Sequence, residues 1–306
     1  MDKILLSKLS IGPIRQIERY GQGVINKVYK VTSSRGAFTL RVYRRKKPKD
    51  FAFEVALLNH LKRLPIPRLL KLGGKYYTKV GKEYAIMYSY MPGRSLKNFT
   101  NRQFQAVGEF IGKFHNQGKN FRWNKHREKL YYFTPKKIDA FESAVLRSEV
   151  AYINRFKEVA LALRQNLLSA KLPSGPIHVD IKPANVLFSQ GHLSGVLDFD
   201  NAYIGPYVLD LAKSMVWLAI SNRKFDLSRA IAVYKGYSRK RKLLPPEYAI
   251  LYQAVKYAFL SHLFVDFYKK AIGEISQNYF NFMAIDFYQA YKSFRMSKED
   301  FYSWLY

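Results

Sequence analysis

A polar run that leads straight into a predicted β-hairpin constrains this chain more than any other feature. The run reads H-x-D-x-x-x-x-N from His178 to Asn185, and two apolar segments joined by a short glycine-containing turn follow it. An acidic D-x-D begins at Asp198, directly after the second apolar segment. The predicted hairpin therefore carries Asn185 at its entry and Asp198 at its exit, where both side chains can face one ion.

This spacing is typical of phosphoryl transfer. One carboxylate accepts the proton of the attacking hydroxyl, while an amide oxygen and a second carboxylate hold the magnesium ion that bridges the phosphates of ATP. We interpret Asp180 as the base and Asn185 and Asp198 as ligands of Mg²⁺, with Asn185 also part of the catalytic loop. Lys182 can reach the transferring γ-phosphate, although a solvated lysine is the alternative. His178 stands where a strand ends and is interpreted as an anchor of the loop.

The charge distribution supports a cation site independently of the motif. The chain has 52 Lys and Arg against 22 Asp and Glu, a formal net charge of +30. From Asp180 to Asp210, however, four acidic residues stand against one basic residue, Lys182. The basic remainder attracts polyanions in general. Because no base-stacking motif accompanies it, nucleic-acid binding is possible but not favoured.

Composition excludes several classes of site. The chain contains no cysteine, so disulfides, thiolate nucleophiles and zinc–thiolate sites are ruled out, and a reducing cytoplasm is compatible with the sequence. No apolar run approaches the ~20 residues that a membrane-spanning helix needs. We expect a soluble, cytoplasmic protein whose 306 residues form one large domain or two smaller ones.

The first 91 residues are predicted to form a strand-rich lobe that binds nucleotide. Strands are expected at 17–20, 24–31, 37–43, 69–77 and 83–90, with one helix at 51–64. The turn that starts at Met91 is the expected hinge. Gly21 and Gly23 lie between the first two strands, where glycines let backbone N–H groups approach phosphate. An ordinary glycine turn is an equally good explanation of this short pattern.

One cation on the third strand is a candidate phosphate ligand. Arg41 stands where kinases place their phosphate-binding lysine, and Glu54 on the following helix is placed to pair with it and hold it over the α- and β-phosphates. Arginine offers a planar fork instead of a point charge. The alternative is a surface ion pair of little consequence.

Residues 92–306 are predicted to form a larger and mainly helical lobe. Helices are expected at 103–116, 135–168 (one or two), 207–220, 247–272 and 279–291. Asp210 near the start of the helix expected at 207–220 is a candidate N-cap that supports the catalytic loop. The predicted class is α+β with two lobes, a small antiparallel sheet followed by helices, and the site is expected in the cleft between them.

Together these residues resemble the aminoglycoside phosphotransferase/choline kinase superfamily, whose fold is similar to that of protein kinases. The resemblance runs from Gly21 to Asp210 and is greatest to the homoserine kinase-like branch, through the segments 90–95, 107–115 and 193–199. The pair Lys182–Pro183 departs from that branch and looks like the catalytic loop of serine/threonine protein kinases.

The resemblance implies a role for each of these positions. Asp180 is then the catalytic base, and Asn185 and Asp198 are the magnesium ligands. The positions that hold ATP are then Gly21 and Gly23 over the triphosphate, and the backbone around Ser89, Tyr90 and Met91 at the adenine.

Three functions remain in competition at this point. An ATP-dependent kinase of a small alcohol is favoured over a protein kinase, because only 11 residues separate Asp198 from Asp210 and leave no room for an activation segment. A non-catalytic protein that binds nucleic acid is disfavoured, because Asp180, Asn185 and Asp198 are all present.

The acceptor is predicted only as a class. Just seven acidic residues follow Asp210 in 96 residues, too few for a pocket that binds polycationic aminoglycosides. A homoserine-like, choline-like or sugar-like alcohol is the expected substrate, and the oligomeric state stays open. The aromatic residues Phe259, Phe264, Phe267 and Tyr268 could line the pocket, but a helix core is the favoured interpretation.

Overall fold

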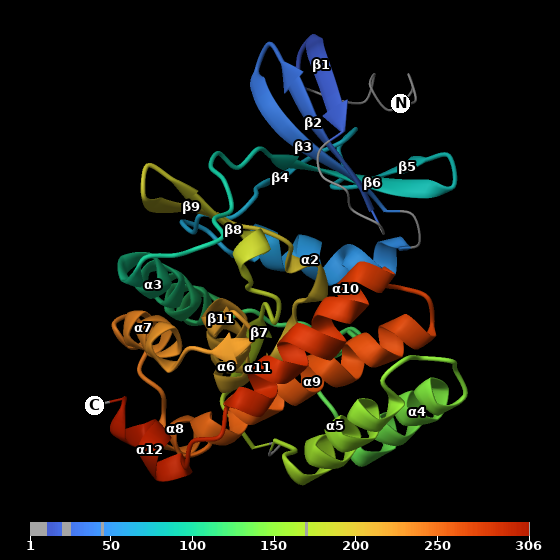
Figure 1. Ribbon diagram of the computed structural model, residues 1–306. Coiled ribbons are helices and arrows are strands. Elements are labelled where there is room, and N and C mark those ends of the chain that lie inside the picture. The colour runs from blue at the N-terminus through green and yellow to red at the C-terminus, as the bar shows by residue number, and fades with distance from the viewer. Residues whose placement is uncertain (1–10, 20–25, 44–45, 169–170, 306) are drawn as a thin grey trace.

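The computed structural model describes residues 11–19, 26–43, 46–168 and 171–305, which form two lobes (Figure 1). A small antiparallel sheet lies above a larger helical body in Figure 1, so the α+β class and the two-lobed, kinase-like architecture are confirmed. The division of the chain at residues 91 and 92 stays a prediction. Within the described residues no helix has the length and apolarity needed to cross a membrane.

The small lobe is a six-stranded antiparallel sheet with one helix beneath it. Its strands are β1 (Ile14–Arg19), β2 (Asn26–Ser33), β3 (Gly36–Tyr43), β4 (Leu69–Leu70), β5 (Thr78–Val80) and β6 (Glu83–Ser89), and its helix is α2 (Pro48–His60). The strand order is β1-β2-β3-β6-β4, with β5 also paired to β6. Arg41 stands opposite Val28 and Ile86, so the sheet places it on a central strand.

Successive side chains of each strand point to opposite faces of the sheet, and both faces are apolar. Leu40 and Val42 of β3 pack into a small core on one face, and Tyr43 joins the main core on the other. Helix α2 buries Phe51 and Phe53 against that second face and so ties the sheet to the larger lobe. The face of the sheet that carries Arg41 is thereby held over the helical lobe.

Two expectations for the small lobe are wrong in detail. The strand predicted at 69–77 breaks after Leu70, because Gly73 and Gly74 adopt φ values of +57° and +82° and reverse the chain. The helix predicted at 51–64 begins at Pro48, a favoured first position, and ends at His60.

The large lobe is helical apart from short strand pairs. Its helices are α3 (Asn101–Gly118), α4 (Pro135–Leu146), α5 (Ile153–Gln165), α6 (Tyr207–Ala219), α7 (Leu227–Ser238), α8 (Pro245–Ala249), α9 (Leu251–Ala271), α10 (Gln277–Asn281), α11 (Tyr288–Ser293) and α12 (Lys298–Ser303). Its strands are β7 (Ser174–Ile177), β8 (Val186–Ser189), β9 (His192–Val196), β10 (Tyr203–Pro206), β11 (Ile220–Ser221) and β12 (Lys224–Phe225). Between α10 and α11 the segment Phe282–Phe287 forms a π-helix.

Helix α9 is the centre of this lobe. It packs against α4, α5 and α6, and its residues Phe259, Phe264 and Phe267 are at most 1% exposed. The core interpretation of these aromatics is therefore confirmed. The helix predicted at 247–272 is interrupted at Ile250, where α8 ends and α9 begins.

Helix α7 is absent from the predicted elements. It packs closely along α3, and a Cβ at Gly108 of α3 would lie 2.0 Å from the carbonyl oxygen of Val233. This approach depends on a glycine in each helix, since a Cβ at Gly236 of α7 would meet the carbonyl oxygen of Gln105 at the same distance. The pair fixes α3 against α7.

Candidate active site

The polar run lies between β7 and the β8–β9 hairpin, as predicted. The hairpin turns through Gln190 and Gly191, both with positive φ, and pairs Val186 with Val196. At its base the N–H of Leu197 donates to the carbonyl oxygen of Asn185 at 2.9 Å. The two ends of the hairpin are thus joined, and Asp198 follows directly beside Asn185.

His178 anchors the loop to the hairpin, which confirms its predicted role. Its Nε2 lies 2.9 Å from the carbonyl oxygen of Leu197, and its Nδ1 accepts from the backbone N–H of Asp180 at 3.3 Å. These contacts assign the proton to Nε2. The ring also packs on Phe199, with centroids 4.5 Å apart.

Asp210 holds the same loop from below. Its carboxylate accepts from the backbone N–H groups of His178 at 3.0 Å and Val179 at 2.7 Å, and from Nε2 of His115 at 2.9 Å. It supports the loop as predicted, but the N-cap prediction is wrong. Helix α6 begins after Pro206, so Asp210 lies within its first turn, where the helix dipole favours a negative charge.

The backbone conformation and the ionisation of the groups around Asp210 both reflect its contacts with the loop. Val179 has a φ of +63°, a strained value for a β-branched residue that is sustained by its surroundings. Burial opposes the charge on Asp210, but the contacts with His115 and His178 together outweigh it and lower the pKa of the carboxyl. Burial lowers the pKa of His115, which stays neutral and donates.

Replacing Asp210 with Ala is expected to cost about 3–5 kcal/mol of unfolding free energy, because three buried donors lose their acceptor. The folded-state pKa of Asp210 is depressed, so this contribution is full above the ordinary carboxyl pKa and fades as pH falls toward the folded value. Urea unfolding at pH 7 and at acidic pH measures it. The control is Asp139→Ala on an exposed ion pair; equal stability of both variants at pH 7 would contradict the anchor.

The loop brings three of the predicted catalytic side chains together. The carboxylate of Asp180 lies 3.0 Å from Nζ of Lys182. Nδ2 of Asn185 donates to the carbonyl oxygen of Asp180 at 2.8 Å and approaches its carboxylate at 3.3 Å. Burial opposes the charge on Lys182, but Asp180 beside it raises the pKa of the ammonium above its usual value. Lys182 is therefore charged at neutral pH.

Arg41 reaches from β3 to the acidic turn of the larger lobe. Its Nη1 lies 2.9 Å from Asp198 and its Nη2 lies 3.1 Å from Asp200, while Lys46 also pairs with Asp200. Burial opposes the charge on Asp198, but the guanidinium outweighs it and lowers the pKa of that carboxyl to about 2. In the described structure these two cations neutralise the acidic turn.

The predicted pairing of Arg41 with Glu54 is wrong. Glu54 instead accepts from the hydroxyls of Tyr43 at 3.2 Å and Tyr88 at 2.9 Å. The two Nη groups of Arg41 are taken by Asp198 and Asp200 instead. Burial, with a contribution from Asp200, raises the pKa of Glu54 to about 7.

The donor set fits magnesium. Mg²⁺ takes one or two carboxylates and completes its shell with water and phosphate oxygens. Asp198 offers a carboxylate, and the amide of Asn185 is fixed by its contacts with Asp180. Among the described residues there is no group of three or more His, Cys, Asp or Glu side chains that could hold a metal. The acidic turn and Asn185 thus carry the candidate ligands.

The structure describes only some of the residues predicted to bind ATP. Gly21 and Gly23 lie outside the described residues. Ser89 ends β6, and its backbone N–H donates to the carbonyl oxygen of Arg68 at 2.7 Å. Tyr90 continues toward the larger lobe, its N–H donating to Ala37 at 3.3 Å, and Met91 follows. The contact of Ser89, Tyr90 and Met91 with adenine stays a prediction.

Arg127 is a site residue that the sequence did not reveal. From the segment between α3 and α4 its guanidinium donates to the backbone carbonyls of Asp50 at 2.6 Å and Ala202 at 2.9 Å, and to that of Asp200. One side chain thereby joins α2 of the small lobe to the acidic turn of the large one.

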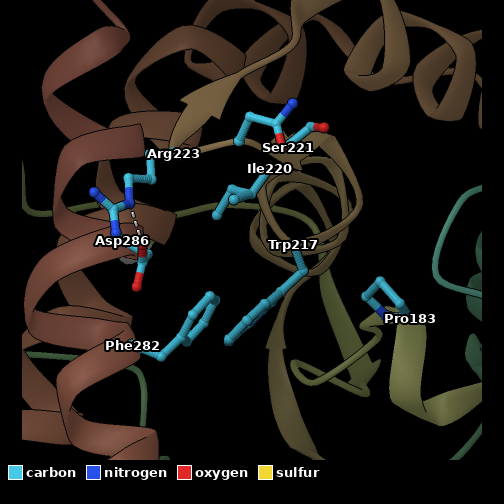
Figure 2. Close-up of a pocket in the computed structure, with 8 residues that line it drawn as sticks. Pro183, Trp217, Ile220, Ser221, Arg223, Phe282 and Asp286 are labelled. Carbon is cyan, nitrogen blue, oxygen red and sulfur yellow. Dashed lines mark hydrogen bonds and ion pairs between the residues drawn. The ribbon is translucent and has the colours of Figure 1, made fainter.

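A cavity of about 560 Å³ lies beside the loop from His178 to Asn185, which contributes Pro183 to its lining (Figure 2). Pro183 of the loop stands at one end and the ion pair between Arg223 and Asp286 at the other, with Trp217 and Phe282 between them. Its size is typical of pockets that bind small molecules.

The sequence and the fold both have relatives of known class. The pattern of the phosphotransferase enzyme family (APH) matches residues 16–244, about three quarters of the chain. A homoserine kinase of Beijerinckia indica is 28% identical over 258 residues, covering 81% of this chain and 79% of that protein. One from Zymomonas mobilis is 27% identical over 268 residues, covering 82% and 80%.

Solved structures share the fold at low sequence identity. An amicoumacin kinase in complex with AMP-PNP, Ca²⁺ and Ami superposes with a TM-score of 0.66 at 17% identity, covering 99% of this chain and 96% of that one. A choline kinase of Streptococcus pneumoniae gives 0.65 at 14% identity, covering 95% and 98%. Since the family pattern spans most of the chain and the fold agrees with it, this protein belongs to the phosphotransferase enzyme family and is a small-molecule kinase.

Proposed function

We propose that the enzyme transfers the γ-phosphate of ATP, with Mg²⁺, to a hydroxyl of a small alcohol. The observation that carries this proposal is the arrangement at the base of the hairpin. There a buried carboxylate, Asp180, lies against Lys182 and Asn185, and a second carboxylate, Asp198, emerges beside them. Relatives named as homoserine kinases and a structural neighbour named as a choline kinase support a small acceptor.

The chemistry assigned to these residues is a direct, in-line transfer. Asp180 orients the acceptor hydroxyl and takes its proton as the new oxygen–phosphorus bond forms and the bond to the ADP leaving group breaks. Lys182 moves its ammonium from Asp180 to the transferring phosphate. Magnesium, when bound, offsets the charge that develops on the phosphate oxygens.

The small lobe supplies the grip on ATP in this proposal. Asp198 and Asn185 would hold the metal, Arg41 would hold the α- and β-phosphates, and Gly21 and Gly23 would present backbone N–H groups to the triphosphate. The segment from Ser89 to Met91 holds adenine. Glu54 keeps the strands and α2 in place through its two tyrosine partners and makes no contact with phosphate.

The proposal is tested by coupling ADP release to a spectrophotometric assay over homoserine, choline, simple sugars and a generic protein substrate. We expect magnesium-dependent ADP release with at least one small alcohol and none above background with the protein. Between Asp198 and Asp210 the chain forms a 3₁₀ turn, β10 and the start of α6, a stretch that leaves no room for an activation segment. Phosphorylation of the protein substrate alone would contradict the proposal.

The rival interpretation is a nucleic-acid site on the basic segment at the start of α2, whose members are Arg44, Arg45, Lys46, Lys47 and Lys49. In the structure Lys46 pairs with Asp200, which favours a role at the active site; Arg44 and Arg45 lie outside the described residues. Gel-shift titration with RNA and DNA at about 0.15 M salt, beside the kinase assay, separates the two. Micromolar nucleic-acid binding that neutralising these five bases removes, with no transfer to any alcohol, would favour the rival.

A further inference from the structure

The cavity in Figure 2 is joined to the catalytic loop through one aromatic wall. Nζ of Lys182 lies 5.4 Å from the centre of the Trp217 ring and 3.0 Å from the carboxylate of Asp180. Trp217 is fixed from behind, since its Nε1 donates to Nε2 of His262 at 2.7 Å. A molecule that lies along this wall with a hydroxyl toward Pro183 therefore has that hydroxyl near the catalytic carboxylate.

The cavity has an apolar middle and a charged far end. The rings of Trp217 and Phe282 are within 15° of parallel with centroids 6.4 Å apart, and Ile220 adds an aliphatic surface. At the far end Nε of Arg223 pairs with a carboxylate oxygen of Asp286 (Figure 2). The cavity thus offers one positive and one negative group, both across an apolar section from the loop.

Arg223 stands where the backbone favours glycine. Strands β11 and β12 pair Ser221 with Lys224, so Asn222 and Arg223 form a two-residue turn. Their φ values are +49° and +63°, the pattern of a type I′ turn, whose second central position is usually glycine. A strained conformation of this kind is a recognised mark of functional sites. The arginine side chain is retained there against the preference of the backbone.

Asp286 lies on an equally unusual piece of backbone. It and Phe282 both belong to the π-helix Phe282–Phe287. Such segments are rare and often occur at functional sites, because the wider turn redirects the side chains that it carries. Two independent departures from regular backbone therefore converge on one cavity beside the catalytic loop.

We propose that this cavity binds the acceptor and that Arg223 and Asp286 select an alcohol carrying both a carboxylate and an ammonium group. The inference rests on the proposed function and deepens it. In the described structure Arg223 faces Asp286 through Nε, which leaves its two Nη groups for a bidentate carboxylate. The side chains are 59% and 30% exposed, so the pair can exchange its partners for the charges of a ligand.

The same pair disfavours the other acceptors. A quaternary ammonium ion would suit the Trp217 and Phe282 rings and Asp286, but Arg223 next to that carboxylate repels it. A neutral sugar would leave both charges of the pair without new partners, and a polycation would meet a single carboxylate that is already paired. A zwitterion satisfies both groups at once.

The test is a set of acceptors in which one group is removed at a time. Homoserine is compared with 4-hydroxybutyrate, which lacks the amine, with 3-aminopropanol, which lacks the carboxylate, and with choline and glucose. We expect kcat/KM for homoserine to exceed each of the others at least about 100-fold. Arg223→Gly and Asp286→Asn should each lower it about 10–100-fold, mainly through KM.

Arg223→Gly also separates function from folding. Because glycine relieves the left-handed strain, this variant should melt about 1–3 °C higher than the wild type while it loses acceptor affinity. Arg239→Gln, on a similarly exposed arginine that pairs with Glu109, is the matched control and should change neither property. An acceptor KM unchanged in both Arg223→Gly and Asp286→Asn would overturn the inference.

The outcomes also keep this inference apart from the proposed function. Transfer to choline or glucose that is indifferent to both substitutions would overturn the pocket assignment and leave the kinase intact. With no transfer to any alcohol, the proposed function fails. The pocket assignment is then tested by calorimetric titration of homoserine in the presence of a non-hydrolysable ATP analogue. Homoserine binding that Arg223→Gly abolishes would support it, and absence of binding to the wild type would overturn it.

Discussion

Asp180→Asn is expected to lower turnover about 10²–10⁴-fold while Mg·ATP affinity stays within about threefold of the wild type. The amide keeps the size of the side chain and its place beside Asn185, but it cannot accept the proton of the acceptor. The measurements are kcat by the coupled assay and Kd by calorimetry.

Two comparisons make the Asp180 result specific. Asp139→Asn removes a charge from an exposed pair and should leave kcat unchanged. A variant of Asp180 that turned over at close to the wild-type rate would show that another group takes the proton. Loss of Mg·ATP binding in the same variant would instead place Asp180 in nucleotide binding.

Asp198→Ala is expected to abolish the magnesium-dependent part of nucleotide binding. Its carboxylate is the one held beside Asn185 by the hairpin base, and magnesium relies on very few protein ligands. Calorimetric titration of ATP with and without Mg²⁺ measures the effect. In the wild type the metal should strengthen binding, and in the variant the two titrations should coincide.

The ion pair between Asp198 and Arg41 calls for a separate control. Arg41→Gln also breaks that pair, but it should weaken ATP binding with and without the metal and keep the difference between the two titrations. Should Asp198→Ala retain the magnesium effect and Asp200→Ala lose it, the ligand would be Asp200, the next carboxylate of the same turn.

Short-range patterns explain why much of this site could be predicted from sequence. The hairpin was predictable because apolar strands flank a short turn with a glycine, Gly191, which accepts positive φ. The loop before it was predictable because the order of donor and acceptor side chains between His178 and Asn185 is set by the chemistry. Both signals lie within about 20 residues of chain.

Contacts that depend on the tertiary fold could not be predicted in this way. Arg127 donates to three backbone carbonyls, and a carbonyl has no residue type to signal it. Glu54 was expected to meet Arg41, but its choice of two tyrosine hydroxyls depends on how α2 lies against the sheet. The Arg223–Asp286 pair joins positions 63 residues apart. Asp286 lies on a π-helix, whose extra residue produces no recognisable period in the sequence.

The most direct test of the central claim is ³¹P NMR of the wild-type enzyme with ATP, Mg²⁺ and the best acceptor of the screen. Direct transfer to a hydroxyl predicts that ADP and a phosphomonoester of the acceptor appear in equal amounts, with no phosphate retained on the protein. Release of inorganic phosphate alone, or a stable phosphoenzyme, would contradict the account.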